Sequence, residues 1–197
     1  MNRLYDYDQT QAIDGSFESV TPGGHVCKIM RAIVEKAASS GADMLCLLLD
    51  VQEGSNLDGV YRRIFDSKRA TKPDAKWPCV FRQPVTDKDG KCSPYFKGLI
   101  ESIEKSNPGY SFISAWDERT LAGKMVGFVF REEEFIVKDT GEIKTSVKPV
   151  WPRSVATIKA GVPVPEIKRL DKVNKTAAAA FNAFGIMAKV TDDDLPF

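Results

Sequence analysis

Met44-Leu45-Cys46-Leu47-Leu48-Leu49-Asp50-Val51 is a short apolar run in this chain of 197 residues. The run is too short for a typical helix, and a polar loop follows it at residues 54–59, so it predicts a buried central strand. Residues 25–35, on its N-terminal side, roughly alternate between apolar and polar side chains, which predicts a neighbouring strand. A turn at residues 37–41 joins these two strands.

The sequence that follows this pair predicts a third strand and then a helix. Residues 60–66 have the character of a strand, and residues 67–93 form a long, polar, basic insertion, part of which could form an extra short strand. Residues 94–105 predict a helix, because Pro94 suits a helix start and apolar side chains then recur every three or four positions.

Residues 124–135 and 143–151 alternate again and predict a hairpin, in which Pro149 and Pro152 favour an edge position for the last strand. The predicted order is therefore three strands, a helix and two strands. This is the order of an OB-fold, a mainly β, five-stranded Greek-key barrel whose helix lies between strands 3 and 4. Such barrels commonly present a strand face and loops to single-stranded nucleic acid.

The chain divides into three predicted parts. Residues 1–22 are polar and rich in turn residues, so they predict a loose N-terminal arm, and residues 23–161 hold the predicted barrel. Residues 162–197 predict an extended linker and an acidic tip. Between these, residues 173–187 fit either a short amphipathic helix or a frayed segment.

Composition excludes several classes of protein. The chain has no apolar run long enough for a transmembrane helix and no signal-peptide stretch at its start, so we expect no membrane partner. Common enzyme motifs are absent and histidine occurs once, which predicts a protein without catalytic residues or a cofactor. The four cysteines lack metal-ligand spacing and predict buried free thiols rather than a metal site.

The net charge of +1 conceals a basic window. Residues 61–100 contain 10 Lys or Arg and 4 Asp or Glu, whereas residues 1–60 contain 4 and 9. Single-stranded nucleic acid is held by a basic groove with aromatic faces on which bases stack, and the window supplies both. The predicted DNA-binding residues are Tyr61, Arg62, Arg63, Phe65, Lys68, Arg69, Lys72, Lys76, Trp77, Phe81 and Arg82, with Lys144, Lys148 and Trp151 on the last strand.

Two aspects of this set stay open. Alternation along the predicted third strand places Tyr61, Arg63 and Phe65 on one face and Arg62 and Ile64 on the other, and the sequence does not decide which set lines the groove. The sequence leaves open, however, whether Phe65 and Phe81 stack on bases or belong to the core.

The last seven residues, Thr191-Asp192-Asp193-Asp194-Leu195-Pro196-Phe197, combine three carboxylates with an aromatic ring. They resemble the acidic C-terminal tip of bacterial single-stranded DNA-binding proteins, which recruits replication, recombination and repair enzymes in that family. The resemblance implies a protein-docking role for Asp192, Asp193, Asp194, Leu195, Pro196 and Phe197. The alternative is an acidic terminus that only aids solubility.

A second resemblance covers residues 20–170. It connects the chain to small phage proteins of replication and recombination modules that are associated with single-stranded DNA. The motifs that carry this resemblance are Gly24-His25-Val26-Cys27-Lys28-Ile29, Pro94-Tyr95-Phe96-Lys97-Gly98, Glu104-Lys105-Ser106-Asn107-Pro108-Gly109-Tyr110 and Leu121-Ala122-Gly123-Lys124-Met125-Val126-Gly127. These motifs are mostly structural in character, so the resemblance implies no particular DNA-contacting residue.

Together these features predict a phage single-stranded DNA-binding protein in the host cytoplasm. It coats exposed strands during replication, recombination or repair and recruits partner enzymes through its tip. Two alternatives remain: a decoy module that occupies host tail-binding proteins, and a strand-annealing recombination protein. Assembly into a homo-oligomer is left open.

Overall fold

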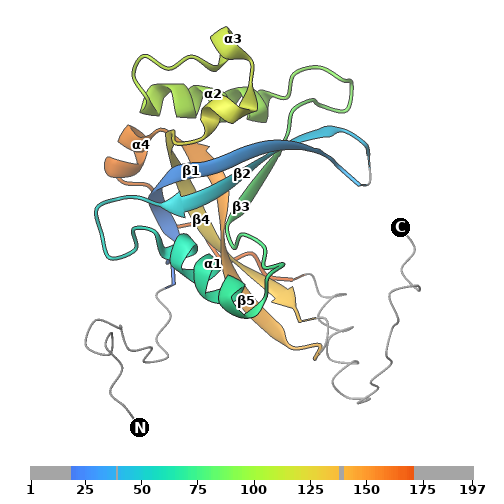
Figure 1. Cartoon of the computed structure of the whole chain (residues 1–197), viewed down its shortest axis with the longest axis vertical. Helices are drawn as coiled ribbons and strands as arrows, with labels where there is room; N and C mark the ends of the chain where they lie inside the picture. Colours follow the sequence, from blue (N-terminus) through green and yellow to red (C-terminus); the bar gives the residue numbers. More distant parts are fainter. Residues whose placement is uncertain (1–18, 39, 138–139, 171–197) are drawn as a thin grey trace.

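The computed structural model describes residues 19–38, 40–137 and 140–170, and these residues form a mainly β fold. One antiparallel sheet of five strands has the order β3-β2-β1-β4-β5 (Figure 1). The strands are β1 (Gly23–Lys36), β2 (Asp43–Val51), β3 (Val80–Pro84), β4 (Met125–Ile136) and β5 (Ile143–Arg153). The four strands predicted at 25–35, 44–51, 124–135 and 143–151 are confirmed as β1, β2, β4 and β5, within two residues at each end.

The strand predicted at residues 60–66 is wrong, because this segment belongs to helix α1 (Val60–Thr71). Val60 and Tyr61 are buried and Ile64 and Phe65 are half-buried, a spacing that defines one side of a helix. Over seven residues this spacing covers less than two helical turns, which is too little to show a helical repeat. The third strand of the sheet is β3, inside the segment predicted as an insertion.

The sheet is curved around β1, which pairs with β4 through residues 23–28 and with β2 through residues 27–36. A bulge between Ile29 and Arg31 interrupts the β1–β2 register, and a bulge bends the strand that carries it. The strands β3 and β5 are the two edges and approach each other. No hydrogen-bonded pairing joins them in the described part of the chain, so the sheet is not closed.

The core lies between the sheet and helix α2 (Pro94–Ser106). Alternate residues of β2 point into it, with Leu45, Leu47, Leu49 and Val51 all at or below 1% exposure. The helix contributes Phe96, Leu99, Ile100 and Ile103 and contacts β3, β4 and β5. Each fully buried side chain of this size contributes about 1.5–3 kcal/mol. In Figure 1, α2 lies at one end of the sheet and α1 at the other.

Three short helices complete the described fold: α3 (Phe112–Ala115), the 3₁₀ helix η1 (Glu118–Leu121) and α4 (Val155–Lys159). The last packs Ile158 against Val26 and Val129 in a second, small apolar cluster. Gly127 permits this contact, because a Cβ there would overlap the Ile158 side chain. Gly127, the last residue of the motif at residues 121–127, therefore has a packing role.

The extended segment predicted after residue 161 lies along β4. Lys168 donates its backbone N–H to the carbonyl of Glu132 and accepts from the N–H of Glu134, both at 2.9 Å. Residues 1–18 of the predicted arm, the segment 173–187 and the acidic tip lie outside the described residues. None of the described helices has the length and apolar character needed to cross a membrane.

Candidate nucleic-acid interface

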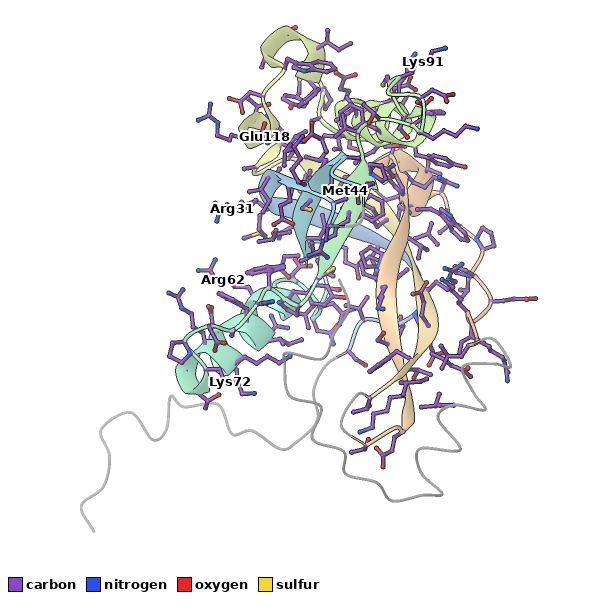
Figure 2. All side chains as sticks on the ribbon, turned by 90° about the vertical axis from the view of Figure 1, so that its right-hand side faces the viewer. Arg31, Met44, Arg62, Lys72, Lys91 and Glu118 are labelled. Atoms are coloured by element: carbon purple, nitrogen blue, oxygen red, sulfur yellow. The ribbon has the colours of Figure 1, made fainter. Side chains whose placement is uncertain are left out.

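A groove of about 520 Å³ lies between the two edge strands, β3 and β5. Figure 2 views the molecule from the side on which these strands face the reader. Four strands and the loop before β3 contribute to its walls. The lining residues are Ile33, Glu35, Cys46, Leu48, Lys76, Trp77, Pro78, Cys79, Val80, Arg82, Val147, Lys148 and Pro149.

Three cations and one carboxylate line this groove. Lys76 comes from the loop before β3, Arg82 from β3 and Lys148 from β5. Lys148 also forms a long ion pair of 3.8 Å with Glu133. Lys76 and Arg82 form no ion pair with a described carboxylate, so their charges face solvent and the groove. Glu35 is the one acid among the described lining residues, so this part of the chain makes the groove net positive.

Trp77 forms part of the groove wall and is held in a fixed orientation. Its indole N–H donates to the backbone carbonyl of Leu49 at 2.8 Å. The ring also packs on Phe65, with 5.2 Å between the ring centroids, and the Arg69 guanidinium lies 5.9 Å from the Phe65 centroid. A half-buried ring fixed in this way is a preorganised surface on which a base can stack.

The groove floor carries a buried thiol between two charges. Cys46 donates through Sγ to Oε2 of Glu35 at 3.4 Å, and Arg82 is its register partner on β3. Burial raises the pKa of this thiol, and its hydrogen bond to Glu35 adds to the increase. The Cys46 thiol therefore stays protonated at neutral pH and serves as a weak donor.

A second cluster lies on β4 and β5 beside the groove. Trp151 is 43% exposed, and the Arg131 guanidinium lies 5.6 Å from the centroid of its ring. Arg131 donates to Glu133 at 2.6 Å. Burial raises the pKa of Glu133, but the Arg131 hydrogen bond and the charges of Lys168 and Lys148 outweigh burial and hold it below its usual value. This anion offsets part of the local positive charge.

The basic residues of α1 lie outside the groove. Arg62 pairs with Asp66 at 3.1 Å, and the Arg63 guanidinium donates to the backbone carbonyls of Asp58 and Asn56. Lys68, Arg69 and Lys72 are exposed. Arg62 and Lys72 are labelled near the two ends of this helix in Figure 2. The alternating face predicted for Tyr61, Arg63 and Phe65 does not exist, because in helix α1 Tyr61 and Phe65 lie on one side and Arg63 lies on another.

The start of α1 is fixed to β2 by a buried carboxylate. Asp50 accepts the backbone N–H of Tyr61 at 2.9 Å and that of Arg62 at 3.2 Å. Burial raises the pKa of Asp50, although hydrogen bonds from three backbone N–H groups oppose this rise. Asp50 therefore replaces a side-chain cap, which Gly59 at the N-cap position cannot provide.

Two aromatics predicted to contact DNA are core residues. Tyr61 is 9% exposed and Phe81 is 8% exposed, and the Phe81 ring packs on Phe128 with centroids 4.8 Å apart. Burial raises the pKa of Tyr61 far above its usual value. These rings are covered by protein atoms and have no face available to a base.

Three cysteines are buried as predicted, but Cys92 is exposed because it lies in the loop before α2.

The groove unites only some of the predicted residues. Lys76, Trp77, Arg82 and Lys148 share it, and Lys144 lies at the distant hairpin end, where it pairs with Glu142 at 3.2 Å. Sequence reasoning missed Glu35, because its position in the groove depends on strand register.

Comparison of the chain with models of known protein families finds no match, and comparison with curated proteins finds none either.

Proposed function

We propose that this protein binds single-stranded DNA in the groove between β3 and β5. The observation that carries the proposal is the combination of Lys76, Arg82 and Lys148 with the fixed ring of Trp77 along one open seam. Cations can neutralise the phosphates of a strand, while the ring stacks on a base.

The proposal includes an OB-fold that is open at one seam. Three observations support it: the order β3-β2-β1-β4-β5, the sharing of bulged β1 between two neighbours, and helix α2 between β3 and β4 in the chain. OB-folds are partly open Greek-key barrels that bind oligonucleotides on strands 2 and 3 and on the loops after strands 1 and 4. The groove draws part of its lining from β2 and β3, which is consistent with such a site, and the rest from β1, β5 and the loop before β3.

Fluorescence titration with oligo-dT tests this function. Arg82→Ala and Lys76→Ala should each weaken binding and reduce the slope of log affinity against log salt by about one, because each removes a phosphate contact. Lys97→Ala is the matched control, since Lys97 is an exposed cation on α2 and outside the groove. Binding that is absent, or insensitive to salt and to both groove variants, would refute the proposal.

The proposed role in the cell is to coat single strands during phage DNA replication or recombination and to recruit partner enzymes. The recruitment part rests on the resemblance of residues 192–197 to the bacterial tip. Deleting Phe197 should abolish pull-down of tip-binding replication or repair proteins while sparing oligo-dT affinity. Equal pull-down by the shortened protein would contradict recruitment. Pull-down without any oligo-dT binding by the intact chain would instead favour the decoy function.

A further inference from the structure

Among the residues that the structure describes, Glu35 is the only carboxylate that lines the groove. It lies on β1, is exposed, and accepts a hydrogen bond from the Cys46 thiol at 3.4 Å. A thiol is a weak donor, and within the described residues no other group donates to this carboxylate or pairs with it. An anion with unused acceptor capacity therefore lies among the groove cations.

The neighbours of Glu35 place it along the path proposed for DNA. Cys46, which Glu35 contacts, is the register partner of Arg82, so the carboxylate and this guanidinium flank the same thiol. Trp77 donates a hydrogen bond to Leu49, which lies three residues after Cys46 on β2. At the usual rise of a strand, these three residues span about 10 Å. A strand that stacks on Trp77 and contacts Arg82 through phosphate would bring another nucleotide to Glu35.

The chemistry of a carboxylate decides which part of that nucleotide it can accept. Phosphates are repelled, so a favourable contact requires the edge of a base that carries N–H donors. The N4 amino group of cytosine is such a donor, and Glu or Asp accepts from it in protein–DNA recognition. Thymine has the acceptor O4 at the same position, and its N3–H donor lies between the acceptors O2 and O4, which both face a carboxylate unfavourably.

We propose that Glu35 reads bases in the groove and gives the protein a preference for bases with an exocyclic amino group, so that cytosine is favoured over thymine. This inference rests on the proposed binding of single-stranded DNA. It makes Glu35 a specificity residue, while Arg82, Lys76 and Lys148 supply affinity that is independent of sequence.

The test measures dissociation constants for oligo-dC, oligo-dT and oligo-dU of equal length at neutral pH and fixed salt. The wild-type protein should bind oligo-dC about fivefold more tightly than oligo-dT, the lower end of the discrimination expected for a good base contact. Oligo-dU should behave like oligo-dT, which separates the amino group from the thymine methyl. Glu35→Gln should reduce the preference to about twofold or less, because the amide also donates to O4.

Asp43→Asn is the matched control, because Asp43 belongs to the same β1–β2 hairpin and pairs with Lys36 at 2.8 Å. It changes the same charge outside the groove lining and should shift all three affinities by a common factor. If Glu35→Gln also shifts all three equally, Glu35 acts only through its charge and base reading is refuted. If the wild-type protein binds none of the oligonucleotides, the proposed function itself fails.

Discussion

Helices α1 and α2 have similar lengths, 12 and 13 residues, but different forces hold them on the sheet. The α2 helix buries four apolar side chains along its length, whereas α1 buries only Val60 and Tyr61 in its first turn. The carboxylate of Asp50 binds the N–H groups of that turn. An apolar stripe fixes the whole of α2 and stabilises the fold. In α1 the Asp50 anchor and a few apolar contacts fix the N-terminal half, and the basic C-terminal end lies in solvent.

The largest effect is expected from removing a buried apolar side chain of α2. Leu99→Ala removes a side chain of 0% exposure from α2 and should lower the free energy of unfolding by about 2–5 kcal/mol, because it leaves a cavity. Urea denaturation measures this loss. The exposed Lys97→Ala on the same helix should change stability by less than about 0.5 kcal/mol. Similar losses for both variants would show that α2 is not a core helix.

Breaking the polar anchor of α1 should have a smaller and more local effect. Asp50→Ala leaves the buried N–H groups of Tyr61 and Arg62 without an acceptor and should cost about 1–3 kcal/mol. Amide hydrogen exchange should increase in α1 and remain slow in α2. Equal increases in both helices would contradict the view that Asp50 anchors α1 alone.

The same anchor predicts a dependence on pH. Because burial raises the pKa of Asp50, the folded protein holds a proton there more strongly than the unfolded chain. The contribution of Asp50 to stability is therefore greatest below its usual pKa near 3.9 and declines as the pH rises through the folded pKa. Asp50→Asn does not titrate, so the stability of wild type relative to this variant should rise on acidification from neutral pH. An unchanged difference would exclude this linkage.

The smallest effect is expected on DNA affinity, when exposed cations at the C-terminal end of α1 are removed. Arg69 lies in the last turn of α1 and Lys72 is the C-cap residue that follows it, and the Phe65 ring beside Arg69 packs on Trp77. Arg69→Ala with Lys72→Ala should weaken oligo-dT binding by about threefold to tenfold at low salt, through lost long-range attraction. Lys97→Ala with Lys105→Ala removes two charges from α2 and should have no effect. Equal losses would show that total charge alone governs affinity.

The contrast between the helices also explains what sequence reasoning could predict. The α2 helix was predictable because Phe96, Leu99, Ile100 and Ile103 repeat at helical spacing over two turns. The α1 helix was mistaken for a strand, because its apolar residues cover little more than one turn and its decisive contact comes from Asp50. The three aromatics Tyr61, Phe81 and Trp77 were all proposed to bind bases, but tertiary packing gives them different positions. Tyr61 and Phe81 are buried in the core, whereas Trp77 lines the groove.

The sequence by itself determined the four long strands, helix α2 and the basic character of residues 61–100, since periodicity and charge are local properties of a chain. Only the tertiary structure decided which cations share a groove. Strand register places Arg82 next to Cys46, and the curvature of the sheet brings Lys148 from the opposite edge. The same register places Glu35 on the groove floor, because residues far apart in sequence become neighbours only through pairing across β1, β2 and β3.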